Sequence, residues 1–212
     1  MMRAATVCFG IIASVPLAAG MVALTGPTPT SFAITLLAAP LGLAVAAAIL
    51  WTRGRREVID AWAGRLLRGA GAGITATLVY DSWRVGVRDI WGIAYDPFRV
   101  QPVFGQILTG LPTTHTLTLA AGWGHHLWLG ALAGMIFAAL APRGGALAGV
   151  GFAAAMQLGR WAMYPSVFGA GLADREFIAN GVLGQMLWGL VLGTAIAITA
   201  ERGNLPFRWT RQ

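Results

Sequence analysis

The chain has 212 residues, of which 57% are hydrophobic and 11% are charged, a composition too apolar for the surface of a water-soluble domain. This composition predicts an integral membrane protein. All fifteen basic residues are arginine, which excludes Schiff-base lysine chemistry and the lysine-dependent phosphate loop. The single Cys8 excludes an internal disulfide, a CxxC redox pair, covalent c-type haem attachment and cysteine-ligated iron–sulfur clusters.

Six stretches are long and apolar enough to cross a bilayer, which takes about 20 mostly apolar residues. In chain order they are residues 4–24, 31–51, 61–80, 117–141, 146–164 and 177–200. They predict an all-α fold, a polytopic integral membrane helix bundle of about six transmembrane helices in a single domain, residues 1–212. Within it, residues 1–56 form an N-terminal helix pair and residues 201–212 form a polar cytoplasmic tail.

The arginines are divided unequally between the two sides that six spans define. With both termini in the cytoplasm, Arg3, Arg53, Arg55, Arg56, Arg65, Arg68, Arg143, Arg202, Arg208 and Arg211 lie inside, and Arg84, Arg88, Arg99 and Arg175 lie outside. Positive charge inside predicts this topology in a bacterial cytoplasmic (inner) membrane. The net charge of +7 is thereby assigned to topology and to anionic lipid, so the lipid bilayer is a predicted partner and nucleic acid is not.

Residues 82–116 separate the third and fourth spans by an unusually long connection, which carries several charges and is interrupted by prolines. We expect an external cap with an interfacial helix over residues 103–109. Long connections of this kind are often functional. Thr113 or Thr114, after Pro112, is the expected N-cap of the fourth span.

The second half of the chain predicts a tandem two-helix repeat, helices 3–4 and helices 5–6. Residues 57–141 form the first hairpin, with its cap, and residues 142–200 form the second. Gly71-Ala-Gly73 matches Gly149-Val-Gly151 at a shift of 78 positions. The fourth and sixth spans align at a shift of either 59 or 60, and the sequence leaves both open. Parallel repeats of this kind occur in membrane proteins.

Glycines recur at four-residue spacing on three of the spans. The predicted packing residues are Gly69 and Gly73 on the third span, Gly122, Gly130 and Gly134 on the fourth, and Gly181, Gly189 and Gly193 on the sixth. Positions i, i+4 and i+8 share one helix face, and small residues there let two backbones approach closely. Spans three to six are therefore expected to form a compact core.

His125 and His126 are the candidate cofactor-binding residues. His126 lies about 13 Å into the fourth span, near the middle of a bilayer, and ionisable residues at that depth are functional candidates. A neutral imidazole could ligate haem or a chlorophyll-type pigment or bind a quinone. The spacing Ala121-x-x-x-His125, with Trp123 and Trp128 nearby, resembles the pigment-binding helix of bacterial light-harvesting polypeptides over a few residues and implies such a pigment.

The alternative is that the histidine has a structural role only and forms a hydrogen bond with Gln185 or Gln157 on a neighbouring helix. His115 lies about 15 Å from His125 along a straight helix, so no metal site is predicted. Asp81 ends the third span at the depth of Arg160 on the parallel fifth span, so we expect an ion pair between them. Otherwise the Arg160 head extends to the outer interface.

No constellation of catalytic residues is present, so the prediction is that the chain is not an enzyme. The favoured function is a non-catalytic accessory or assembly subunit of a larger bacterial membrane complex, respiratory or photosynthetic, with other membrane-protein subunits as partners. One alternative is a tetrapyrrole- or quinone-binding membrane protein that uses His125 or His126. Another is a small transporter, in which more charged residues should line a path.

Overall fold

The computed structural model describes residues 56–92, 96–163 and 177–203, and the regular structure in these ranges is entirely helical. The elements are α3 (Arg56–Trp91), α4 (Val100–Thr109), α5 (Thr116–Leu140), α6 (Ala146–Met163), the π-helix η1 (Phe177–Gly184) and α7 (Gln185–Gly203). The predicted all-α class is confirmed for this part of the chain. The first two predicted spans, 4–24 and 31–51, lie outside the described residues.

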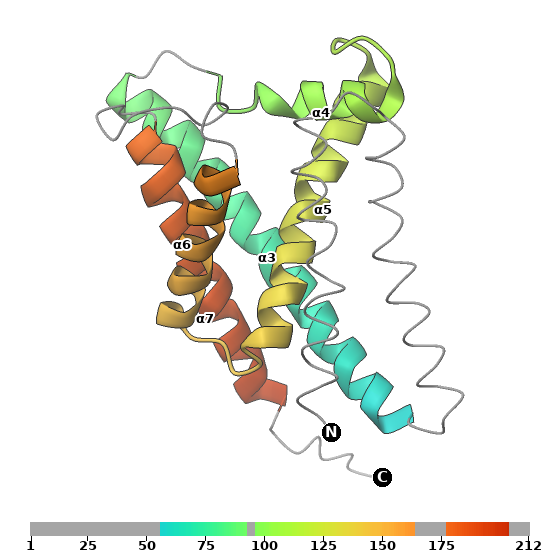
Figure 1. The fold of residues 1–212 in the computed structure, drawn as a ribbon, viewed down its shortest axis with the longest axis vertical. Helices are drawn as coiled ribbons and strands as arrows, with labels where there is room; N and C mark the ends of the chain where they lie inside the picture. The colour runs from blue at the N-terminus through green and yellow to red at the C-terminus, as the bar shows by residue number, and fades with distance from the viewer. Residues whose placement is uncertain (1–55, 93–95, 164–176, 204–212) are drawn as a thin grey trace, which may run out of the picture.

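Helix α3 is the centre of the arrangement (Figure 1). It runs diagonally, packs against α5 on one side and α7 on the other, and α6 packs against α7. Helix α4 lies across the first turns of α5, at the end of the molecule where α3 finishes. The α5–α6 turn, the start of α3 and the end of α7 lie at the opposite end.

Two of the described helices are long and apolar enough to cross a membrane, Thr116–Leu140 and Gly181–Glu201. They coincide with the fourth and sixth predicted spans. In the fifth predicted span, the apolar helical segment Ala146–Leu158 is shorter than a membrane crossing requires. The described chain is therefore a helical protein with two candidate membrane helices.

Helix α3 continues to Trp91, well beyond residue 80, where the third span was expected to end. Charged residues after residue 80 were interpreted as the end of the helix, but they end only its apolar part. Asp81 pairs with Arg84 one turn later. Arg88 lies in the last turn, where its positive charge interacts favourably with the negative end of the helix dipole. The helix stops before Gly92, which has a left-handed φ of 62°.

The connection to α5 contains the expected interfacial helix, α4, which starts at Val100 rather than at residue 103. The N-cap of α5 is His115, not Thr113 or Thr114. The Nδ1 atom of His115 accepts a hydrogen bond from the backbone N–H of Leu117 at 3.2 Å. An imidazole nitrogen thus accepts the N-capping hydrogen bond that a threonine hydroxyl was expected to accept.

Close backbone approach holds the helices together. A Cβ atom on Gly73 would overlap the carbonyl oxygen of Gly130, and one on Gly134 would overlap that of Gly69. These four glycines form the α3–α5 seam. Gly122 faces α4, because a Cβ there would overlap the carbonyl oxygen of Gln101.

The apolar core lies where α3, α5, α6 and α7 meet. Its buried residues are Ala72, Ala76, Ala133, Phe137, Ala138, Ala153, Trp188, Leu192 and Ile196. The Trp188 indole N–H donates to Thr77 Oγ1 at 3.1 Å, and the Trp83 indole N–H donates to the carbonyl oxygen of Ala179 at 2.9 Å. Both bonds connect α3 to the second hairpin, so the two halves form one packed body.

Candidate functional site

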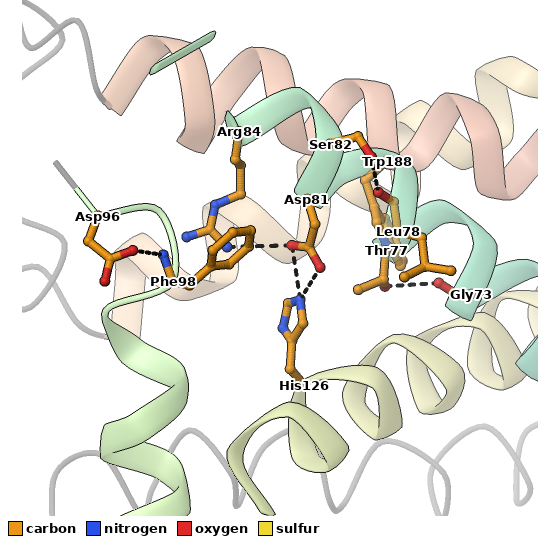
Figure 2. A network of polar contacts seen from close by, with 10 residues as sticks. All are labelled: Gly73, Thr77, Leu78, Asp81, Ser82, Arg84, Asp96, Phe98, His126 and Trp188. Atoms are coloured by element: carbon orange, nitrogen blue, oxygen red, sulfur yellow. Dashed lines mark hydrogen bonds and ion pairs between the residues drawn. The ribbon is translucent and has the colours of Figure 1, made fainter. Parts of the chain in front are cut away.

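A polar cluster of Asp81, Arg84 and His126 lies at the end of the α3–α5 seam (Figure 2). Gly73, Thr77 and Asp81 are four residues apart, so they share the face of α3 that packs against α5. Asp81 lies about two turns after Gly73 and one turn after Thr77. His126 lies one turn before Gly130 on α5. The same periodicity that brings the glycines together therefore brings a carboxylate and an imidazole together.

The Asp81 carboxylate is the centre of this Asp81 site. His126 Nε2 lies 3.0 Å from Oδ1 and 2.9 Å from Oδ2, and donates its proton to the carboxylate. The Nη1 atom of Arg84 lies 3.6 Å from Oδ1. Asp81 is only 7% exposed, and the charge of a buried carboxylate must be compensated. Arg84 supplies the opposite charge and His126 the shorter hydrogen bonds.

Aromatic rings surround the cationic side of the site. The guanidinium carbon of Arg84 lies 5.4 Å from the ring centre of Tyr80 and 5.3 Å from that of Phe98, within the range of cation–π attraction. Trp123 packs 4.9 Å from Phe98 and meets His126 edge-on at 5.9 Å. Rings from α3, α5 and the segment before α4 thus flank the Arg84 guanidinium and the His126 imidazole.

The Asp81 site has hydrogen-bonding capacity that its own residues leave unused. With Nε2 donating to Asp81, a neutral His126 presents Nδ1 as an acceptor, and Nδ1 bonds to none of the described residues. The His126 side chain is 20% exposed. The buried Nε of Arg84 also has no hydrogen-bond partner within the described ranges. A ligand or water molecule could engage either atom.

His125 lies in a different environment from His126, because adjacent helical residues point about 100° apart. It is buried beneath α4, with its ring centre 4.7 Å from that of Phe104. The structure therefore does not bring the two predicted cofactor-binding histidines into one site. One belongs to the α4–α5 contact and the other to the Asp81 site.

The remaining predicted polar residues are on the second hairpin. Gln157 and Gln185 are both buried, and the side-chain oxygen of Gln157 has no hydrogen-bond partner in the described part of the chain. His126 bonds to Asp81, not to either glutamine as the structural alternative supposed. The predicted partner of Asp81, Arg160, belongs to α6, but its side chain lies outside the described ones.

The predicted packing glycines meet in two separate groups. The first is the α3–α5 seam, and in the second Gly189 and Gly193 meet Gly149 at the start of α6. Gly122 belongs to the α4–α5 contact, and Gly181 lies in the π-helix η1. Sequence reasoning missed Arg84, Phe98 and Trp123 as parts of the Asp81 site. It also missed the Asp81–His126 pair, although both residues continue a four-residue glycine series.

Within residues 56–92, 96–163 and 177–203, no group of three or more His, Cys, Asp or Glu side chains is placed to hold a metal ion. Comparison of the chain with family models, with curated proteins and with solved structures gave no match.

Proposed function

We propose that the chain is a multi-pass protein of a bacterial inner membrane and works as a non-catalytic subunit of a larger membrane complex. The proposal includes six spans with both termini in the cytoplasm and a tandem repeat of helices 3–4 and 5–6. The carboxylate of Asp81 is engaged by His126 and Arg84 of the same chain, which supports a structural role for these three residues.

The outward face of α3 carries the proposal. Gly64, Leu67, Gly71, Ile74 and Leu78 follow one another at steps of three or four residues, and Leu67 is 73% exposed. Among the described residues, a Cβ atom on Gly64 or on Gly71 would meet nothing within 4 Å. Glycines on an apolar, outward face suit a helix of another subunit, because close approach is the main source of attraction between helices in lipid.

Outward leucines on α6 support a membrane setting. Leu147 is 88% exposed and Leu158 is 60% exposed. Large apolar side chains that stay outside a folded bundle mark a lipid or protein contact.

Extraction of the full chain from membranes directly into lipid nanodiscs, followed by native mass spectrometry, tests the subunit role. We expect an assembly heavier than the 22.2 kDa chain, which Gly71→Leu dissociates without lowering the Tm of the isolated chain. Gly151→Leu on α6, also at a position with open space, is the matched control. A wild-type particle that holds one copy of the chain and lipid alone would refute the subunit role.

Topology is tested separately by cysteine labelling in a Cys8→Ser background. A cysteine replacing Arg175 should react only from outside, and one replacing Arg143 only from inside. The opposite pattern of labelling would refute the orientation.

A second candidate function, ligand binding at His126, is favoured by one observation. Its Nε2 donates to a carboxylate, the arrangement that orients histidine ligands of metals, while Nδ1 is left unused. An unprotonated Nδ1 could ligate the iron or magnesium of a tetrapyrrole. A protonated Nδ1 could instead donate a hydrogen bond to a quinone carbonyl. Absorbance of the purified chain between about 350 and 900 nm tests the tetrapyrrole class, and lipid extraction with mass spectrometry tests the quinone. Loss of either ligand in His126→Gln but not in His115→Gln would support the site.

A further inference from the structure

The contacts within the second hairpin, α6–α7, repeat those within the first, α3–α5. In each hairpin four glycines make the backbone contacts: Gly69, Gly73, Gly130 and Gly134 in the first, and Gly145, Gly149, Gly189 and Gly193 in the second. A Cβ on Gly149 would overlap the carbonyl oxygen of Gly189, as one on Gly73 would overlap that of Gly130. The neighbour of the third glycine is also equivalent, Thr77 in the first hairpin and Ala153 in the second.

These contacts define a single register for each pair of equivalent helices. Gly149 follows Gly73 by 76 positions, and Gly145 follows Gly69 by the same number. The shift is therefore two residues shorter than the alignment at 78 that the sequence suggested.

On the returning helices the shift is 59, one of the two registers that the sequence left open, since Gly189 follows Gly130 and Gly193 follows Gly134. The sequence agrees with the shift of 76 on the first helices. Gly69-Ala-Gly-Ala-Gly73 and Gly145-Ala-Leu-Ala-Gly149 differ at one position only.

The shifts of 76 and 59 positions also give an equivalent residue in the second hairpin for each residue of the Asp81 site. Asp81 corresponds to Gln157, Arg84 to Arg160 and His126 to Gln185. We infer that Gln157, Arg160 and Gln185 are a second copy of the Asp81 site from which the acid and the imidazole have been lost. The inference rests on the tandem repeat that belongs to the proposed function.

Burial and helix geometry support this correspondence. Gln157 is 8% exposed and Gln185 is 4% exposed, so both are enclosed as Asp81 is. Gln185 is the first residue of α7, and the steps from it to Gly189 and Gly193 follow regular α-helical turns. The π-helix η1 immediately before it has more residues per turn, so the equivalence of the returning helices ends at Gln185.

The second copy has different chemistry from the first. A glutamine amide carries no charge and does not ionise near neutral pH, so Gln157 and Gln185 cannot form the ion pair that Asp81 forms in the first copy. The side-chain oxygen of Gln157 has no partner among the described residues, whereas the equivalent Asp81 carboxylate is engaged by two partners. The arginine position is the part common to both copies, and a carboxylate at position 157 would restore the missing acid.

Restoring that acid in the full chain tests the inference. Gln157→Glu should raise the Tm by roughly 2–4 °C, the effect of a modest stabilising interaction in a chain of this size. Arg160→Gln in the same background should abolish the gain. The matched control is Gln101→Glu. Gln101 is also buried and its side-chain oxygen also has no partner among the described residues, but the residue three positions later is Phe104. The control should lower the Tm.

A fall in Tm for Gln157→Glu as large as for Gln101→Glu, unaffected by Arg160→Gln, would overturn the inference. Should these variants fail to fold, disulfide formation in membranes between cysteines at positions 157 and 185, in a Cys8→Ser background, gives an independent answer. We expect a cross-link there and none between position 185 and the exposed position 158. Absence of the 157–185 cross-link would refute the second copy while leaving the subunit role to the nanodisc experiment.

Discussion

The α3–α5 and α6–α7 hairpins pack through the same glycine contacts, yet among the described residues only the first encloses an acid, an arginine and a histidine in one cluster. The second hairpin shows that the backbones approach closely without that cluster. Glycine contacts are therefore sufficient to set the distance between the helices. The Asp81 site adds something that packing does not require, either a choice of partner helix or a chemical role.

The largest expected difference in stability is between replacing Asp81 in the first hairpin and replacing the equivalent Gln157 in the second. Asp81→Leu leaves Arg84 and His126 without their acceptor and should reduce the free energy of unfolding by about 3–5 kcal/mol, as when a buried ion pair loses one member. Gln157→Leu removes an amide with an unpaired oxygen and should cost at most about 1 kcal/mol. Chemical unfolding in detergent measures both. Equal losses would mean that the first hairpin does not depend on its charges.

The glycine seams should respond alike in the two hairpins. Gly73→Val and Gly149→Val each place a side chain against a backbone carbonyl and should destabilise the protein by about 1–3 kcal/mol. Gly71→Val and Gly151→Val introduce the same β-branched residue where the described residues leave open space, and so isolate the effect of the contact. A loss restricted to one hairpin, measured as a difference in Tm, would contradict their equivalence.

Coupling between Asp81 and its partners distinguishes a real ion pair from mere proximity. A double-mutant cycle of Asp81→Asn with His126→Gln should give an interaction free energy of about 0.5–3 kcal/mol. The same cycle with Arg160→Gln tests the pairing predicted from sequence. Strictly additive effects in the His126 cycle would show that the short contacts at Asp81 contribute nothing to stability.

The smallest expected effect concerns the bond between the two hairpins. Thr77→Val removes the acceptor of the buried Trp188 indole N–H and should cost about 1 kcal/mol. Thr75→Val is the matched control, because the Thr75 hydroxyl is exposed and bonds only to the carbonyl oxygen of Gly71 in its own helix. Hydrogen exchange at the Trp188 indole, followed by NMR, should accelerate in the first variant alone.

Helix positions with a long apolar run were predictable from the sequence, as the fourth span shows: residues 117–141 were expected and α5 covers Thr116–Leu140. The length of α3 was not, because the charges after residue 80 mark the limit of apolar surface and say nothing about the backbone. The partner of Asp81 was missed for a related reason. Depth along a span was used to match Asp81 with Arg160, whereas His126 belongs to α5, which packs directly against α3. The Asp81–Arg160 pair itself stays a prediction.

The 36 residues of α3 correspond to an axial length of about 54 Å, against roughly 30 Å for the hydrocarbon layer of a bilayer. Asp81 lies about 38 Å along the axis from the start of this helix. In the proposed topology, an upright α3 that starts at the inner edge of the hydrocarbon would carry that carboxylate beyond the outer edge, and tilting the helix would lower it. Under that proposal, bilayer thickness would act on the hydration of the Asp81–His126 pair through the tilt of α3, so lipid chain length is a variable to control in reconstitution.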